Sequence, residues 1–207
     1  MKNIKICVIG LGYIGLPTSA MFATHGCQVI GVDVNEKVVV ALNRGEITIE
    51  EPYLDIMVQA AVRSGQLKAY TKPREADAFI IAVPTPITED KKADMSCVIS
   101  AAEMIVPYLR KGNIVILEST SPVGTTEDLL VPILEKSGLK IGEELYVGHS
   151  PERVLPGKIL WELVNNNRIV GGINQQSAEK IRDLYRIFVN GEIYLTTAST
   201  AEMCKTM

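Results

Sequence analysis

The chain has 207 residues, with 21 basic and 24 acidic side chains and a formal net charge of −3 at pH 7. The charges are spread along the chain without a polybasic run, which argues against nucleic acid as a partner. Hydrophobic residues make up 47% of the chain and aromatic residues only 5%. This composition is typical of parallel strands that helices cover on both faces.

The location of the protein is predicted from three features. No apolar run reaches the roughly 20 residues that a membrane span needs. The first residues run directly into a strand pattern, so we predict no signal peptide. The cysteines are scattered and lack metal-ligand spacing: they are Cys7, Cys27, Cys97 and Cys204. Together these features predict a cytoplasmic protein with no membrane partner and no metal site.

Short apolar runs alternate with segments of helical period along the chain. The predicted strands are 4–9, 28–32, 67–70, 78–83, 113–117, 145–149, 168–170 and 193–195. The predicted helices are 13–25, 36–43, 53–63, 96–109, 125–136 and 176–188, and 200–207 is predicted to open another. This alternation predicts an α/β fold with a doubly wound, mostly parallel sheet.

A glycine-rich turn joins the first strand to the first helix. Gly10 permits the tight turn, Gly12 lets the backbone approach a pyrophosphate, and Gly15 allows the helix to pack closely on the strand. The helix N-terminus adds amide donors and the positive end of the helix dipole. Because the motif follows a strand and opens a helix, it predicts an NAD(P)-binding Rossmann-like domain.

The second strand ends in Asp33, about 20 positions after the glycine turn. A carboxylate at this position accepts hydrogen bonds from both hydroxyls of a ribose, and it would repel a 2′-phosphate. The sequence therefore predicts NAD rather than NADP as the cofactor. The alternative is a structural glycine turn with a solvated aspartate.

Three further loops end predicted strands, namely 83–86, 118–126 and 150–157. Each loop alone is explained by turn chemistry, since Ser, Thr, Pro and Gly are the usual loop residues. However, ligands of such sheets bind outside the carboxyl ends of the strands. Three polar loops at one edge therefore predict a shared site.

These loops, in this order, resemble those of the UDP-sugar 6-dehydrogenases, the family of UDP-glucose and UDP-N-acetylmannosamine dehydrogenases. The resemblance covers essentially the whole chain and rests on six separated motifs: GLGYIGLP, GVDVN, IAVPTP, ILESTSPVGTT, PERVLPG and TAEMCK. Within the family, the motifs look most like the UDP-N-acetyl-D-mannosamine branch of bacteria and archaea. UDP-glucose dehydrogenases typically carry an acidic residue where this chain has Pro156, which argues against glucose.

The resemblance implies a domain layout and a reaction. Residues 1–198 would form the NAD-binding domain, and 199–207 would begin a central helix that leads to a UDP-sugar domain. The chain would then be the front part of a longer, homo-oligomeric oxidoreductase. That enzyme would oxidise the C6 alcohol of UDP-N-acetyl-D-mannosamine to a carboxylate with two NAD, through a cysteine thioester. The nucleophile would lie beyond this chain, so Cys204 would be an ordinary helix residue and this fragment would be inactive alone.

The resemblance also implies roles for individual residues. Those that would bind NAD, besides the three glycines, are Tyr13, Ile14, Asp33, Thr85, Thr120 and Thr126. The catalytic residues would be Glu152, Lys205 and Thr120, and the residues that contact the sugar nucleotide would be Arg153, Val154 and Lys205. An ammonium at Lys205 would favour negative charge on the reacting oxygen.

Several alternatives stay open at this point. Without the family match, Lys205 would be interpreted as a solvated helix residue. His149 is expected to have a packed or hydrogen-bonded structural role, and Trp161 to be a packing residue. The nearest rival functions are a dehydrogenase for UDP-glucose or UDP-N-acetylglucosamine, and a stand-alone NAD-binding module.

Overall fold

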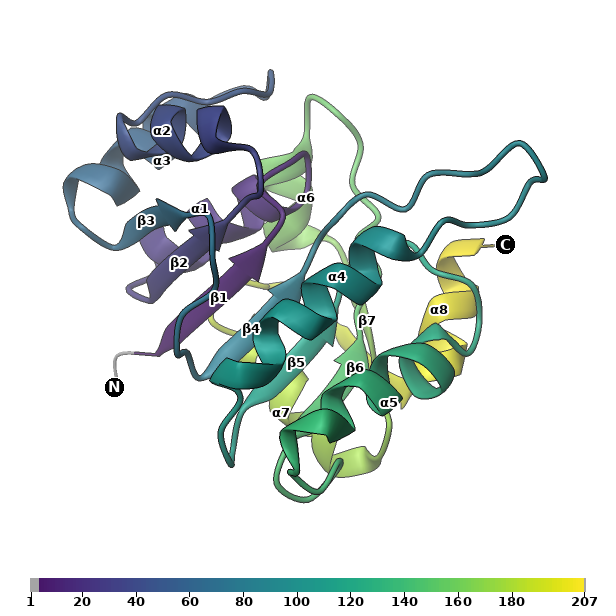
Figure 1. Cartoon of the computed structure of the whole chain (residues 1–207). Helices are drawn as coiled ribbons and strands as arrows, with labels where there is room; N and C mark the ends of the chain where they lie inside the picture. The colour runs from purple at the N-terminus through teal and green to yellow at the C-terminus, as the bar shows by residue number, and fades with distance from the viewer. Residues whose placement is uncertain (1–3, 207) are drawn as a thin grey trace.

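A computed structural model describes residues 4–206, which form one sheet between two layers of helices (Figure 1). The eight strands lie in the order β3-β2-β1-β4-β5-β6-β7-β8. Their bounds are β1 Lys5–Ile9, β2 Gln28–Val32, β3 Leu67–Tyr70, β4 Ala78–Ile81, β5 Ile114–Leu117, β6 Tyr146–His149, β7 Arg168–Gly172 and β8 Ile193–Thr197. The predicted α/β sheet is confirmed.

Parallel pairing runs through the sheet except at one place. The strands from β3 to β6 are all parallel to their neighbours, and β7 and β8 are parallel to each other. Between β6 and β7 the pairing is antiparallel, with Gly148 opposite Gly172 and His149 opposite Gly171. The reversal places the start of β7 at the edge where β6 ends, so a side chain at Arg168 reaches the carboxyl ends of the other strands.

The helices divide between the two faces of the sheet. They are α1 Gly15–Thr24, α2 Glu36–Asn43, α3 Leu54–Arg63, α4 Ser96–Ile105, α5 Val131–Leu134, α6 Ile159–Asn165, α7 Gln175–Tyr185 and α8 Ala198–Thr206. Helices α1, α3, α6 and α7 share one buried apolar cluster with the sheet, and α4 and α5 share the other. Strand residues alternate between these clusters, as Ile6 and Cys7 do on β1, which is the two-residue period of a strand buried on both faces.

Two predicted helices differ in the structure, and one helix of the structure was not predicted. The helix predicted over 96–109 ends at Ile105 and continues as a 3₁₀ turn, Val106–Tyr108, because Pro107 has no N–H to continue the α-helical ladder. The helix predicted over 125–136 begins as a π-helix, Thr125–Leu130, before the short α5. Helix α6 was not predicted, since its seven residues are too few to show a clear helical period.

The last helix packs very closely on the sheet. A Cβ on Gly171 of β7 would lie 2.3 Å from the Thr197 carbonyl oxygen and 2.7 Å from the Ala201 Cβ. Glycine is therefore required here for α8 to approach β7. Since β8 ends at the edge of the sheet opposite the end of β6, α8 runs back toward the carboxyl ends of β5 and β6.

Membrane-spanning helices and metal-binding clusters are both absent from residues 4–206. No helix within residues 4–206 combines the length and the apolar character that a bilayer span requires. Nor does that part of the chain hold three or more His, Cys, Asp or Glu side chains placed to bind one metal ion.

Candidate functional site

A pocket of about 840 Å³ lies between the glycine turn and α4. Its lining is mainly apolar, and it includes the turn residues from Gly10 to Ile14, the end of β2 with Asp33, the segment 82–84 after β4 and one side of α4. The predicted residues Tyr13, Ile14 and Asp33 thus lie together around one cavity. Its size is in the range of ordinary small-molecule sites.

The structure requires glycine at two of the three glycine positions of the turn, and for different reasons. Gly10 has a φ of +94°, and a Cβ there would lie 2.5 Å from the Ala82 carbonyl oxygen, so both its conformation and its space demand glycine. A Cβ on Gly15 would lie 1.9 Å from the Gly10 carbonyl oxygen. A Cβ on Gly12 would meet no heavy atom within 4 Å. The fold itself leaves the space over Gly12 open, and this is the space that a pyrophosphate needs.

The backbone around Gly12 presents hydrogen-bond donors without partners. Among residues 4–206, no protein group accepts from the N–H groups of Gly12 or Tyr13, and no side chain caps the start of α1. Unsatisfied amides at a helix N-terminus form a ready anion-binding site. The turn therefore fits the pyrophosphate of NAD in shape, donors and dipole.

The Asp33 carboxylate is held in place by two backbone amides. Oδ2 accepts from Leu11 N at 3.0 Å, and Oδ1 accepts from Asn35 N at 2.9 Å. A carboxylate accepts about four hydrogen bonds, so both oxygens retain capacity for the two hydroxyls of a ribose. The half-buried side chain borders the pocket, as its predicted role requires.

The loops after β4 and β5 lie side by side. The Ser119 hydroxyl donates to the Val83 carbonyl oxygen at 2.7 Å, which ties the two loops together. This brings the half-buried Thr85 and the exposed Thr120 to the same edge of the sheet. Their contacts with NAD remain a prediction.

Thr126 lies in a different environment from the one its predicted role suggests. It is fully buried, and its hydroxyl donates to Glu202 Oε1 at 2.6 Å. The same carboxylate accepts from Thr126 N at 2.7 Å and from Gly124 N at 2.6 Å. Glu202, which sequence reasoning missed, therefore fastens α8 to the loop after β5, and direct contact of Thr126 with NAD remains a prediction.

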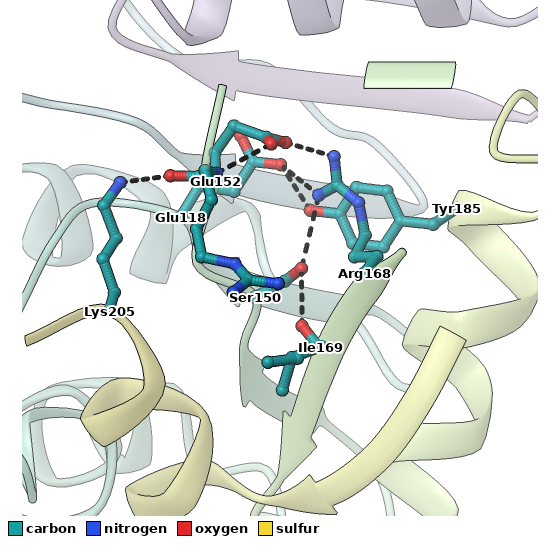
Figure 2. A network of polar contacts seen from close by, with 8 residues as sticks. Glu118, Ser150, Glu152, Arg168, Ile169, Tyr185 and Lys205 are labelled. Carbon is teal, nitrogen blue, oxygen red and sulfur yellow. Dashed lines mark hydrogen bonds and ion pairs between the residues drawn. The ribbon is translucent and has the colours of Figure 1, made fainter. Parts of the chain in front are cut away.

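Lys205 and Glu152 meet at this edge, as Figure 2 shows. The Lys205 ammonium donates to the backbone carbonyl oxygen of Glu152. Burial lowers the pKa of Lys205 below its usual range, although the Glu152 carboxylate acts in the opposite direction. Two of the predicted catalytic residues, 53 positions apart in the chain, are thus brought together.

Behind Lys205 lies a buried cluster of charges, which we call the ionic cluster: Glu118, Glu152, Arg168 and Tyr185 (Figure 2). Arg168 Nη2 forms an ion pair with Glu152 Oε2, and Nη1 lies 3.4 Å from Glu118 Oε1. Tyr185 donates its hydroxyl to the same Glu118 oxygen at 2.5 Å, and its ring lies 4.1 Å from the guanidinium carbon. All four side chains are buried. The Arg168 guanidinium is therefore the one cation of this cluster, and it faces the carboxyl groups of both Glu118 and Glu152.

Burial dominates the titration of this region. It raises the pKa of the Glu118 carboxyl to about 7, against the lowering effect of the Arg168 guanidinium. His149, at the end of β6, is fully buried, and neither ring nitrogen has a hydrogen-bond partner within the described residues. Burial, together with a smaller effect of the nearby Lys205 ammonium, lowers the pKa of His149 to about 4.

The loop after β6 leads from the ionic cluster to the molecular surface. Arg153 is exposed, and Val154 is half-buried against the apolar cluster on the α1 side. Both positions are accessible, but contact with a sugar nucleotide remains a prediction. Glu51 holds the far end of the loop, where its carboxylate accepts from Gly157 N and Ile159 N, each at 2.7 Å.

The remaining sequence expectations have mixed outcomes. His149 is packed in the core, as expected, but without a hydrogen bond among residues 4–206. Cys204 lies in α8, as expected. The packing role of Trp161 is wrong, because 65% of this residue is exposed on the short helix α6.

Comparison with known proteins adds a family to this geometry. The family pattern described as "UDP-glucose/GDP-mannose dehydrogenase family, NAD binding domain" matches residues 4–189. The chain belongs to this family. The resemblance inferred from the six motifs is therefore confirmed, and the pocket over the glycine turn lies in the family's NAD-binding domain.

Relatives in the family narrow the comparison. A UDP-N-acetyl-D-mannosamine dehydrogenase of Methanococcus maripaludis is 53% identical over 98% of this chain and 47% of its own length. An NDP-N-acetyl-D-galactosaminuronic acid dehydrogenase of Ralstonia solanacearum is 50% identical over 97% of this chain and 49% of its own.

A solved structure supports the same comparison. The UDP-N-acetyl-mannosamine dehydrogenase Cap5O of Staphylococcus aureus matches with a TM-score of 0.95 and 51% identity, over 97% of this chain and 49% of that one. The chain thus spans about half the length of the relatives that it matches.

Proposed function

We propose that this family member is the NAD-binding part of a UDP-N-acetyl-D-mannosamine dehydrogenase. The observation that carries the proposal is that the NAD pocket and the contact between Lys205 and Glu152 lie at the same carboxyl edge of the sheet. The 53% identity with the Methanococcus maripaludis enzyme supports the choice of substrate. The reaction would be the oxidation of the sugar C6 alcohol to a carboxylate in two steps.

The chain's own residues would divide the work as follows. NAD, when bound, would supply the acceptor for hydride. Asp33 would bind the adenosine ribose, and the amides of Gly12 and Tyr13 would bind the pyrophosphate. Lys205, with its pKa lowered by burial, would stabilise negative charge on the reacting oxygen and exchange its proton. Glu152 would accept a proton near the same atom, and Arg153 and Val154 would contact the sugar nucleotide.

The identity of the sugar rests on fewer residues. Pro156 stands where UDP-glucose dehydrogenases typically carry an acid, and this argues against glucose. The Ralstonia solanacearum relative, named for a different N-acetylated sugar, is only slightly less similar than the Methanococcus maripaludis enzyme. An N-acetylhexosamine is therefore the better-supported substrate class, and mannosamine is the proposed member. We expect the working enzyme to be a cytoplasmic homo-oligomer.

The cofactor assignment is tested by calorimetric titration of NAD and NADP into the chain. NAD should bind more tightly than NADP, and Asp33→Ala should weaken NAD binding markedly. Asp55→Ala, which removes an exposed acid from α3, is the matched control and should bind NAD as the unchanged chain does. If Asp33→Ala binds NAD with unchanged affinity, the ribose assignment is wrong.

An activity assay tests the proposal that this chain binds NAD while the nucleophile lies in another part of the enzyme. The 207-residue chain should bind NAD but produce no sustained NADH with UDP-N-acetyl-D-mannosamine, because the thiolate nucleophile would lie in a segment that this chain lacks. The Methanococcus maripaludis relative serves as the positive control. Sustained NADH production by the chain alone would contradict the proposed division. It would then be necessary to look for a nucleophile among the chain's own cysteines.

A further inference from the structure

Glu118 is a buried carboxyl group to which the proposed reaction gives no task. It lies at the end of β5, and its side chain is completely removed from solvent. Its two oxygens differ sharply. Oε1 receives the Tyr185 hydroxyl and faces Arg168, whereas Oε2 has no hydrogen-bond partner within the described chain.

The groups around Glu118 do not supply enough positive charge to stabilise both Glu118 and Glu152 as carboxylates. Arg168 on β7 is shared with Glu152, whose oxygen is much closer to the guanidinium than the 3.4 Å that separates Glu118 from it. Tyr185 on α7 is a neutral donor. Lys205 on α8 is directed to the backbone carbonyl of Glu152 rather than to a carboxylate. His149 on the neighbouring β6 is neutral near pH 7, since burial lowers its pKa to about 4.

A buried carboxylate with one unpartnered oxygen is far more costly than the neutral acid. The geometry thus favours a proton on the Oε2 atom of Glu118 and the charge on Glu152, which has the closer contact with the cation. The pKa of Glu118, raised to about 7 chiefly by burial, agrees with this distribution. Glu118 would then be a neutral acid over the lower part of the physiological range.

We infer that Glu118 is a positioning residue of the proposed active site, which retains a proton and so leaves the Arg168 guanidinium to the carboxylate of Glu152. Arg168 then fixes Glu152, and the backbone carbonyl of Glu152 fixes Lys205. When Glu118 loses its proton, its carboxylate competes for Arg168 and places a second negative charge near Lys205. The inference rests on the proposed function for its catalytic meaning, but the proton itself is measurable without any turnover.

The proton is tested by infrared spectroscopy of the 207-residue chain. Near pH 6, exposed Asp and Glu side chains, with ordinary pKa values of about 4, are almost fully ionised. The band of a neutral carboxylic acid should therefore be visible at this pH and disappear as the pH rises through about 7. Glu118→Gln should abolish the band. Glu103→Gln, which alters an exposed acid on α4, should keep it.

Two outcomes would overturn this distribution of protons. One is the absence of a neutral-acid band near pH 6 in the unchanged chain. The other is its persistence in Glu118→Gln, because the proton would then reside on another carboxyl. Tyr185→Phe gives an independent check if Glu118→Gln does not fold. Removal of the hydroxyl that hydrogen-bonds Glu118 should shift the disappearance of the band to higher pH, since this hydrogen bond lowers the pKa.

The positioning role is tested on Lys205 itself. In a chain with ¹³C-labelled lysine, the NMR signal of Lys205 should show an inflection near pH 7 as Glu118 ionises, and Glu118→Gln should remove it. Because Glu118 is outside the lining of the NAD pocket, NAD affinity should be the same in both proteins. A Lys205 signal that ignores the ionisation of Glu118 would refute the positioning role. Failure of the proposed function would appear instead as loss of NAD binding in both.

Discussion

The two halves of the carboxyl edge of the sheet differ in the groups that they present. The half formed by β1, β2 and β4 offers backbone amides, open space over Gly12 and one anchored carboxylate at Asp33. The half formed by β5, β6 and β7 contains the buried ionic cluster, in which Arg168 forms an ion pair with Glu152 and faces Glu118. The first half is incomplete until a ligand arrives, whereas the second is held together by its own ion pairs. A substitution in the first half should therefore be able to weaken NAD binding without changing the free energy of unfolding. A substitution in the second half should change the free energy of unfolding as well.

The largest effect is expected at Arg168, where this contrast is sharpest. Arg168→Ala leaves the Glu152 carboxylate buried without its cation, and removal of one partner of a buried pair typically costs about 3–5 kcal/mol. Urea unfolding near pH 7 measures the loss. Arg186→Ala removes a more exposed arginine that is 3.9 Å from Glu192 and donates to the Gly191 carbonyl oxygen at 2.6 Å, and it should cost only about 1 kcal/mol. Equal losses in the two variants would mean that the ionic cluster does not stabilise the fold.

The second effect is a dependence of stability on pH that arises at His149. Because burial holds the folded pKa at about 4, below the ordinary value of 6.5, the unfolded chain binds more protons between these values. Stability should therefore rise with pH across this window, by at most about 3 kcal/mol, and become independent of His149 above it. His149→Leu should flatten the rise, as followed by thermal unfolding at a series of pH values. His25→Gln, at the other histidine, should keep it.

Glu118 contributes to the same curve with the opposite sign. Its raised pKa means that the folded chain binds its proton more tightly, so stability should fall as pH rises from about 4.5 to about 7. The two effects overlap between pH 4.5 and 6.5 and are separated by comparing each variant with the unchanged chain at every pH. Between about pH 4.5 and about 7, Glu118→Gln should become progressively more stable relative to the unchanged chain, because only the unchanged chain loses stability across this window. A constant difference would contradict the raised pKa.

The glycine turn provides a pair of substitutions of the same kind with different expected results. Gly15→Ala forces a Cβ against the Gly10 carbonyl oxygen and should cost about 1–3 kcal/mol of stability, as overpacking usually does. Gly12→Ala meets no atom of the fold and should leave stability nearly unchanged, but weaken NAD binding roughly tenfold or more, equal to about 1.4 kcal/mol. Denaturation and NAD titration of both variants measure this. Unchanged NAD affinity in Gly12→Ala would remove the pyrophosphate from that space.

The smallest effect is expected at the cap of α2. Asn35 accepts a hydrogen bond from Lys37 N at 3.0 Å through its side chain, and Asn35→Ala should cost about 1 kcal/mol. Denaturation with urea is again the measurement. The NAD affinity should change little, because the Asn35 backbone N–H that orients Asp33 remains. A large loss of NAD binding in this variant would show that the side chain of Asn35 takes part in the pocket.

The sequence predicted one half of the edge much better than the other. The glycine turn and Asp33 lie within one strand-helix-strand unit, so local spacing alone placed them. The partners of the ionic cluster are distant in the chain: Glu118 and Arg168 are 50 positions apart, and Glu118 and Tyr185 are 67 apart. Local periodicity contains no information about contacts of this range.

Arg168 was missed for a second, physical reason. In a parallel sheet, the start of the strand at 168 would lie at the edge away from the site. The antiparallel pairing of β7 with β6 places Arg168 at the site instead. The residue pattern of β7 does not predict this reversal of strand direction. A charged residue at the beginning of an otherwise apolar strand was the available signal. Glu202 gave no such signal, since an acid in a predicted helix is normally solvated.

The return of α8 to the carboxyl edge has a consequence for how the protein is made. Every residue that lines the NAD pocket lies between Ile9 and Met104, whereas the contact of Glu152 with Lys205 needs the chain as far as α8. The chain leaves the ribosome from its N-terminus, and a domain generally folds as a unit. All residues of the pocket are therefore synthesised before Lys205, but the contact between Lys205 and Glu152 forms only when the last helix of the domain has been made.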